Sequence, residues 1–138
     1  MTMVFKDREE YISGEYRFKD KSKNKRTNAH KLIAAWAEKE IRNLKRIAKV
    51  KGIRVPKAIY LKENILVMEF IGQNKIAAKR LRDAKIEKEK MSDVYIEVVQ
   101  IMRKLFVEAK LVHGDLSEYN ILYHQGQLIL IDVSQSME

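Results

Sequence analysis

The chain has 138 residues, which is enough to bury the core of a single domain. Its 28 lysine and arginine residues outnumber 19 aspartate and glutamate residues, and the net charge of +9 favours polyanionic partners, although a solvated basic surface explains it equally well. The lack of cysteine excludes disulfides and thiolate metal sites, and no apolar run is long enough to span a membrane, so we expect a soluble, cytoplasmic protein without membrane attachment.

The N-terminal segment predicts little regular structure. Met3–Phe5 is a short run with strand character, and Gly14 interrupts the stretch between this run and Lys19. Lys19–Arg26 is rich in lysine and contains no apolar residue, so it cannot bury surface and is expected to form a mobile loop. Ser22 lies within that loop.

The next segment predicts a long helix that runs from about residue 27 to Val50. Thr27 or Asn28 would cap its N-terminus, and Gly52 would stop it. Its apolar residues recur at intervals of three and four, which is the pattern of a helix with one buried face. That stripe consists of Ile33, Trp36, Ala37, Ile41, Leu44, Ile47 and Ala48.

A glutamate interrupts the apolar stripe of this helix. Glu40 lies one turn after Trp36 and one turn before Leu44, whereas Glu38 shares the solvent face with Arg42. An unpaired carboxylate on a buried face is costly. Glu40 therefore either reaches water at the rim of that face or pairs with a cationic group.

Two strands are expected after Pro56, at 58–61 and 65–71, joined by a polar turn at 62–64. Gly72 would end the second strand. Residues 73–91 are polar and basic, with apolar residues too sparse for a helix.

A second helix is predicted at about Asp93–Ala109, with Ser92 as its cap. Its spacing indicates one buried stripe, which is more simply explained as core than as a cofactor site. The residues of this stripe are Val94, Val98, Ile101, Met102, Leu105 and Phe106.

The last part of the chain predicts a β-hairpin. Ile121–Tyr123 and Leu128–Ile131 are runs of strand-forming residues, and the polar connector between them contains Gly126, which can adopt a positive φ. A hairpin brings its two ends together, so Asn120 and Asp132 are expected to lie side by side.

Asp115 lies five residues before Asn120 on the polar loop that leads into this hairpin. Three oxygen-bearing side chains, those of Asp115, Asn120 and Asp132, thus converge on one end of a rigid element. Carboxylate and amide oxygens suit a site for magnesium and phosphate.

The sequence His113-Gly-Asp-Leu-Ser-Glu-Tyr-Asn120, followed by a hairpin and Ile131-Asp-Val-Ser-Gln-Ser136, closely resembles the RIO family of atypical protein kinases, in its first branch. The segments from Val4 to Phe18 and from Trp36 to Leu44 resemble the same family. The resemblance implies an α+β, protein-kinase-like (RIO) fold. We expect residues 1–138 to form part of that domain, with a partial small lobe at about 1–72 and the start of a helical large lobe at about 73–138.

The resemblance also implies an activity, namely ATP-dependent serine/threonine phosphoryl transfer or ATP hydrolysis coupled to maturation of the small ribosomal subunit. Asp115 would act as the base for, or orient, the attacking hydroxyl or water. Asn120 and Asp132 would hold Mg²⁺ against the β- and γ-phosphates, and Asp132 can also accept the phosphoryl group. The implied partners are ATP and a pre-40S-like ribosomal precursor with its rRNA.

Residues for the nucleotide come from the same resemblance. Met68 would lie beside the adenine, and the carbonyl of Glu69 and the N–H of Ile71 would hydrogen-bond its edge. Pro56 is also carried over as a nucleotide contact. Glu40 would pair with the phosphate-binding lysine of the family, which makes it our choice over the neighbouring glutamate on the solvent face.

The sequence departs from the family pattern in two places. Its glycines, at 14, 52, 72, 114 and 126, are isolated and form no glycine-rich loop. The strand lysine of the family would fall a few residues before Met1, and Lys6 is a poor substitute for it. The chain also ends soon after Asp132, so we expect a central piece of a RIO kinase domain that turns ATP over poorly by itself.

Two alternatives remain open from the sequence. The chain could be a non-catalytic, basic RNA- or ribosome-binding fragment, which the net charge and the missing phosphate loop favour. The family can carry phosphorylated serines in the loop that matches Ser22, whereas a plain solvated loop would explain the same composition.

Overall fold

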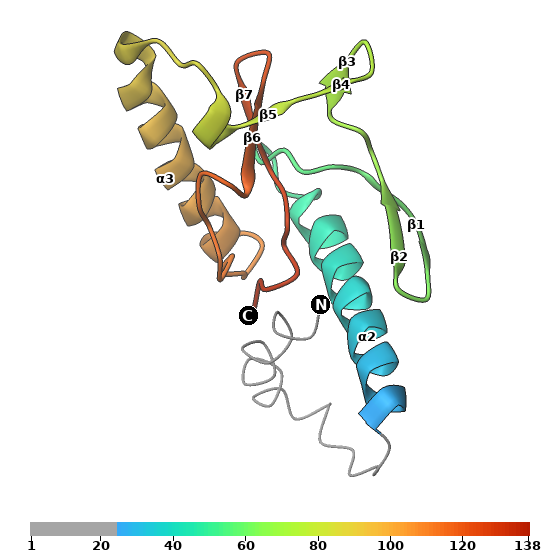
Figure 1. Ribbon diagram of the computed structural model, residues 1–138. Helices are drawn as coiled ribbons and strands as arrows, with labels where there is room; N and C mark the ends of the chain where they lie inside the picture. The colour runs from blue at the N-terminus through green and yellow to red at the C-terminus, as the bar shows by residue number, and fades with distance from the viewer. Residues whose placement is uncertain (1–24) are drawn as a thin grey trace. The chain divides into compact units, whose positions relative to one another are not determined.

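The computed structural model describes residues 25–138, with side chains from residue 31 onward (Figure 1). The chain divides after Lys31, and the unit Leu32–Glu138 contains every predicted site residue. The strand expected at Met3–Phe5, Lys6 and Ser22 lie outside the described residues. Lys25 and Arg26, which were expected at the end of the basic loop, belong instead to a helix.

The described elements mix helices with antiparallel strands, which confirms the α+β prediction. In chain order they are α2 (Lys25–Ile47), β1 (Ala58–Lys62), β2 (Ile65–Met68), β3 (Gly72–Gln73), β4 (Ile76–Ala77), β5 (Lys79–Arg80), the 3₁₀ turns η2 (Leu81–Asp83) and η3 (Lys88–Lys90), α3 (Met91–Val107), β6 (Ile121–His124) and β7 (Gln127–Leu130). The strands form three separate sheets, in the orders β1-β2, β3-β4 and β5-β6-β7.

Helix α2 differs from the prediction at both ends. Thr27 and Asn28 lie inside the helix, so neither is its cap, and the helix ends at Ile47 rather than at Val50. The chain then turns through Gly52, whose φ of 81° is a conformation that favours glycine. A Cβ at this position would also press on the Nζ end of Lys104, but that side chain is flexible, so the backbone conformation is the stronger reason for glycine.

The first strand pair forms as predicted, but its second strand is shorter. β1 and β2 pair from Ala58 opposite Met68 to Lys62 opposite Ile65. β2 ends at Met68, so the residues at 69–71 form a connector and not the end of a strand. The segment at 73–91 contains no α-helix before Met91. It supplies β4, the 3₁₀ turns η2 and η3, and β5, which pairs with β6.

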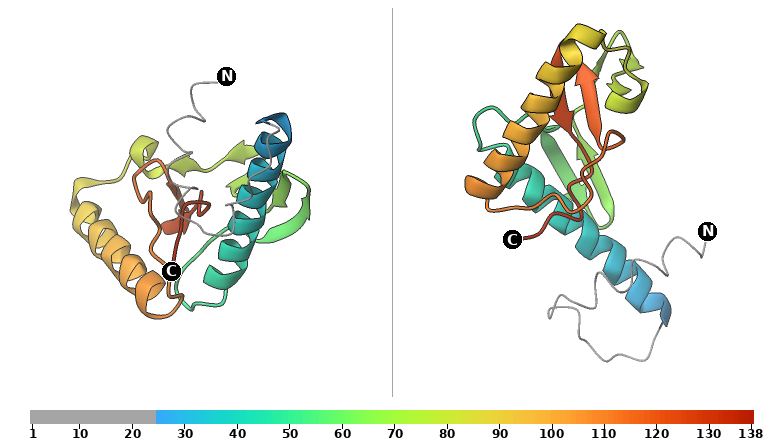
Figure 2. Two further views of the ribbon diagram at one scale, coloured as in Figure 1. Left: turned by 90° about the horizontal axis from the view of Figure 1, so that it is seen from below. Right: turned by 90° about the vertical axis from the view of Figure 1, so that its left-hand side faces the viewer.

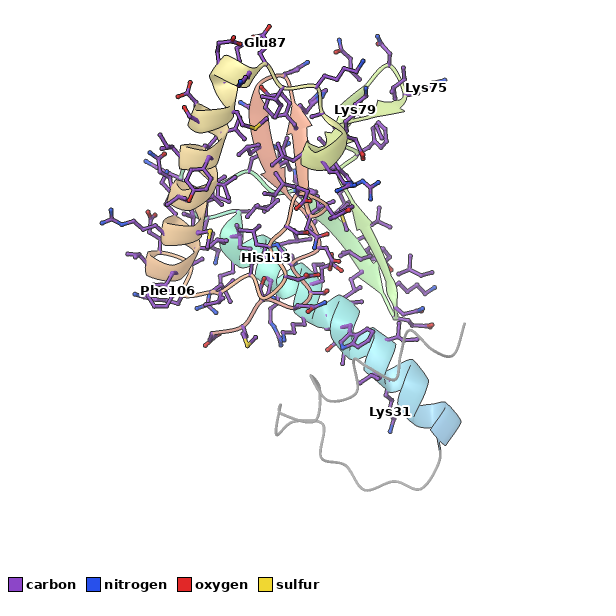
Figure 3. All side chains as sticks on the ribbon, turned by 60° about the vertical axis from the view of Figure 1, so that its left-hand side comes forward. Lys31, Lys75, Lys79, Glu87, Phe106 and His113 are labelled. Atoms are coloured by element: carbon purple, nitrogen blue, oxygen red, sulfur yellow. The ribbon has the colours of Figure 1, made fainter. Side chains whose placement is uncertain are left out.

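Helix α3 begins at Met91, with Lys90 in the N-cap position, so Ser92 lies inside its first turn and the predicted cap is wrong. Val94, Ile101 and Leu105 are buried as expected. Met102 and Phe106 are 52% and 65% exposed, and Figure 3 shows Phe106 at the C-terminal end of the helix, so the predicted stripe was too wide. Along residues 25–138, no helix combines the length and apolarity needed to cross a membrane.

The β6–β7 hairpin lies at the centre of the core. Its strands pair from Ile121 opposite Leu130 to His124 opposite Gln127, and the turn residues Gln125 and Gly126 both have positive φ, as a type I′ turn requires. One hydrophobic cluster joins it to α2 and α3. The cluster contains Leu44, Ile47, Val50, Ile53, Val55, Val94, Ile101, Leu105, Ala109, Leu111, Ile121, Leu128, Leu130 and Val133. The segment after β7 runs between α3 and the later turns of α2 (Figure 2).

Candidate functional site

The base of the β6–β7 hairpin brings two predicted site residues together. The backbone N–H of Ile131 donates to the carbonyl of Asn120 over 3.0 Å, which extends the strand pairing by one step. Asp132 is the next residue along the chain. Asn120 and Asp132 therefore leave the hairpin side by side, as its geometry requires.

The loop before the hairpin ties Asp115 to the same place. The side-chain nitrogen of Asn120 donates to the backbone carbonyl of Asp115 at 2.9 Å and to its Oδ2 at 3.2 Å. These bonds fix which end of the amide faces the aspartate. The amide oxygen of Asn120 is the end that remains to contact a cation.

Asp132 has an unusual backbone conformation, with a φ of 53°. Left-handed backbone is uncommon for residues other than glycine, and such positions cluster at functional sites. Ser134 donates from Oγ to the Oδ1 of Asp132 at 2.7 Å, so a short hydrogen bond holds the carboxylate. The residue is partly buried.

Helix α2 contributes a carboxylate near Asp132. Glu40 is partly buried, and burial, followed by the negative charge of Asp132, raises the pKa of Glu40 above its ordinary value. Glu38 is exposed. The charge of Asp132 disfavours the charged form of Glu40, and a cation placed between the two side chains would offset that repulsion.

The donor set around the hairpin base suits magnesium bound together with phosphate. Among the described residues, no group of three or more His, Cys, Asp or Glu side chains is arranged to hold a metal ion. Magnesium is usually bound by one or two carboxylates together with phosphates of the substrate. The amide oxygen of Asn120 and the carboxylate of Asp132 fit that pattern.

His113 lies two residues before Asp115, at the start of the loop that carries that aspartate, and is 4% exposed. Burial lowers the pKa of His113 below its ordinary value, and the backbone of Ile131 and the charges of Asp132 and Asp115 oppose that shift without cancelling it. The imidazole is therefore expected to be neutral near pH 7. The sequence pattern includes this histidine but gave it no role.

Three residues predicted to contact the adenine lie at or just after the end of β2, namely Met68, Glu69 and Ile71. Pro56, the further nucleotide contact, precedes β1. Met68 is partly buried against the core, and Pro56 is buried. Among the described residues, no hydrogen bond uses the carbonyl of Glu69 or the amide of Ile71. Both groups therefore remain for the edge of an adenine ring.

The side chain of Glu69 has a structural role that the sequence did not reveal. It pairs with Arg54 and accepts a hydrogen bond from the backbone N–H of Lys57 at 3.0 Å, and these bonds lower the pKa of Glu69. The carbonyl of Arg54 in turn accepts from the N–H of Leu130 at 2.9 Å. The connector after β2 is thus linked through Arg54 to β7, the strand that leads to Asp132.

The fold is protein-kinase-like. It is similar to the crystal structure of a Rio2 kinase–ADP/Mg²⁺–phosphoaspartate complex from Chaetomium thermophilum, with a TM-score of 0.66 and 25% sequence identity. The similarity covers 78% of this chain and 33% of that one.

The sequence comparison identifies the family. The model of the RIO domain matches residues 1–138, so the chain belongs to the RIO family. It is 50% identical over 137 residues to the serine/threonine-protein kinase rio1 of Dictyostelium discoideum, which covers 99% of this chain and 23% of that protein. It is also 47% identical over 134 residues to the serine/threonine-protein kinase RIO3 of Mus musculus, covering 97% of this chain and 25% of that protein. The chain thus spans about a quarter of the length of these relatives.

Proposed function

We propose that the protein is a serine/threonine kinase and ATPase of the RIO type, that it uses Mg²⁺-ATP, and that it acts in maturation of the small ribosomal subunit. The observation that carries the proposal is the hairpin base, where hydrogen bonds link Asp115 to Asn120 and the strand pairing brings Asn120 beside Asp132. The names of the relatives support the kinase activity, and the ADP, Mg²⁺ and phosphoaspartate of the Rio2 complex support the nucleotide and the metal.

The chemistry we propose is in-line transfer of the γ-phosphoryl group. Asp115 accepts the proton of the attacking serine or threonine hydroxyl, or of water, and orients it. The amide oxygen of Asn120 and the carboxylate of Asp132 hold the metal. When bound, Mg²⁺ neutralises the charge of the β- and γ-phosphates.

Asp132 can also take the phosphoryl group itself. One carboxylate oxygen attacks the γ-phosphorus while the bond from that phosphorus to the bridging oxygen breaks, and ADP leaves with the electron pair. Water then hydrolyses the acyl phosphate to regenerate the carboxylate and release inorganic phosphate. The hydrogen bond from Ser134 holds one oxygen of Asp132 in place during the attack.

Glu40 and the connector after β2 complete the proposed site. The raised pKa of Glu40 reflects burial and a nearby negative charge, both of which a bound cation or a lysine ammonium would offset. The free carbonyl of Glu69 and amide of Ile71 would bind the adenine edge. The proposed division into lobes near residue 72 falls directly after this connector.

The test is steady-state ATP turnover by the protein expressed from its complete reading frame, measured with and without Mg²⁺. Asp115→Asn should lower kcat by about 10²-fold or more, since general base catalysis contributes about 10²- to 10⁴-fold. Asp93→Asn, a change at an exposed aspartate of α3, is the matched control and should turn over ATP like the wild type. Metal-independent turnover, or equal loss in both variants, would contradict the proposal.

A groove of about 410 Å³ favours a second candidate function, RNA binding. Lys79 and Lys85 line it together with the ring of Tyr123. The rest of the lining combines polar side chains with aliphatic ones, namely Gln73, Asn74, His124, Gln125, Ile76, Ala77, Ala78 and Ala84. Figure 3 shows where Lys75 and Lys79 lie, at the strands β4 and β5. Lysines can contact phosphates, and an aromatic ring can stack on a base.

RNA binding is tested by fluorescence anisotropy with a single-stranded oligonucleotide. The double variant Lys79→Glu/Lys85→Glu should weaken binding at least about tenfold and reduce its salt dependence. Lys49→Glu/Lys110→Glu makes the same change of net charge at exposed lysines outside the groove. Equal weakening by the two double variants would mean that net charge, and not the groove, binds RNA.

A further inference from the structure

A buried amide connects α2 to the segment that follows Asp132. Asn43 is only 7% exposed, and it lies one helical turn after Glu40. Its side-chain nitrogen donates to the carbonyl of Val133 at 2.8 Å and to the carbonyl of Ser136 at 3.2 Å. Both protons of the amide are therefore used on backbone that is 90 and 93 residues away in the sequence.

On its other side, the same segment is bound to the loop that carries Asp115. Ser136 is 1% exposed, and its hydroxyl donates to the carbonyl of His113 at 3.2 Å. Val112 and Met137 exchange backbone hydrogen bonds, with N–H to O distances of 2.8 and 3.0 Å. One residue after His113, Gly114 has a φ of 81° and packs so closely that a Cβ would lie 2.8 Å from the carbonyl oxygen of Gln135.

These contacts form one connected network, which we call the Asn43 clamp and define as Asn43, Val133, Ser136 and His113. It joins the helix that carries Glu40, the residue directly after Asp132, and the loop that carries Asp115. Buried carbonyls that lose their donor are costly, because no water replaces it. The three elements are therefore expected to hold one fixed arrangement in the folded protein.

We infer that Asn43 is a positioning residue, which acts through the Asn43 clamp to hold Asp132 in register with Glu40 and with the loop that carries Asp115. The inference rests on the proposed function for its effect on turnover. The role of Asn43 is more than structural, because the carbonyl to which it donates, that of Val133, belongs to the residue directly after Asp132. Small displacements of reacting groups cost large factors in rate, about 10²-fold for 1 Å.

The clamp makes a specific kinetic prediction. Asn43→Leu keeps the size of the side chain and removes its hydrogen-bond donors. The variant should have a kcat at least tenfold lower and a KM for ATP that changes less than threefold. KM is spared because the proposed adenine contacts at Glu69 and Ile71 lie on a different connector. Ser136→Ala removes only the hydroxyl bond to the loop, so it should fold normally and lower kcat by a smaller factor.

The experiment uses the protein from its complete reading frame and includes a control for stability. Val50→Ala also alters a buried side chain, just after the end of α2, but Val50 lies outside the clamp. It should destabilise the fold and leave kcat unchanged at temperatures well below unfolding. Hydrogen exchange without nucleotide provides a second readout, since the amides of Val112 and Met137 should exchange faster in Asn43→Leu and Ser136→Ala than in Val50→Ala.

The two readouts separate the inference from the proposed function. If the wild type does not turn over ATP, the proposed function fails, and hydrogen exchange still decides whether the clamp couples these elements. Faster exchange with a selective loss of kcat supports the inference. Wild-type kcat in both clamp variants, an equal loss of kcat in Val50→Ala, or unchanged exchange at Val112 and Met137 would overturn it.

Discussion

Leu130 is the core residue for which we expect a substitution near the candidate site to cost the most stability. It is 0% exposed, belongs to the central hydrophobic cluster, and lies two residues before Asp132. Replacing a buried leucine with alanine costs about 2–5 kcal/mol, because the transfer energy of the lost atoms and a cavity both count. Native domains are stable by only about 5–15 kcal/mol, so Leu130→Ala should remove a large part of the total.

The assay is urea unfolding followed by circular dichroism, with the free energy of unfolding taken from the midpoint and slope. Ile65→Ala is the matched control, because Ile65 is also a strand residue but is 63% exposed. We expect that control to change the free energy of unfolding by no more than about 0.5 kcal/mol. If the two variants lose the same stability, the assignment of the hairpin to the core is wrong.

Three further predictions concern pH and association. The pKa of His113 is lowered in the fold, so the unfolded chain binds a proton at a higher pH than the folded one. The free energy of unfolding should therefore fall as the pH drops below about 6.5. His113→Gln should flatten that pH dependence in urea unfolding curves. The pKa of Glu40 is raised, so the charge of this carboxylate destabilises the folded protein at neutral pH. Glu40→Gln should therefore raise the urea midpoint at pH 7, whereas Glu38→Gln should not. The reverse result would mean that the buried face of the helix is misassigned. Phe106 is an exposed aromatic residue of α3, and we expect it to promote self-association of the 138-residue chain. Phe106→Lys should therefore shift the sedimentation-velocity distribution towards the monomer, and an unchanged distribution would contradict a role of that face.

The β6–β7 hairpin could be predicted because its information is local. Two runs of strand formers and one glycine specify the pairing, and the pairing specifies that Asn120 and Asp132 lie side by side. The roles of these residues and of Asp115 stay predictions until they are measured. Glu40 could be placed on the inner face of α2 because helical periodicity is equally local.

The parts that could not be predicted depend on contacts between distant segments. β5 has two residues and exists because it pairs with β6, more than forty positions later in the chain. The apolar spacing of α3 gave no means to tell Phe106, which is exposed, from Leu105, which is buried, because the width of the buried face depends on what packs there. Asn43 showed no signal at all, since an asparagine within a helix indicates a role only when its distant partners are known.

The link between Arg54 and Glu69 shows the same limit. The family resemblance gives a role to the backbone of Glu69 and none to its side chain. The structure shows that this side chain joins the connector after β2 to β7 through Arg54. Such a link depends on three segments meeting in space, which periodicity and turn signals do not report.

The central claim is that Asp132 is the reacting carboxylate of a RIO-type ATPase site. The most direct test is to incubate the protein from its complete reading frame with Mg²⁺ and γ-labelled ATP, then measure both turnover and covalent label. We predict that the wild type acquires a hydroxylamine-sensitive label, and that Asp132→Asn acquires none and loses turnover by about 10²-fold or more. Near-normal turnover or an unchanged label in Asp132→Asn would contradict the claim.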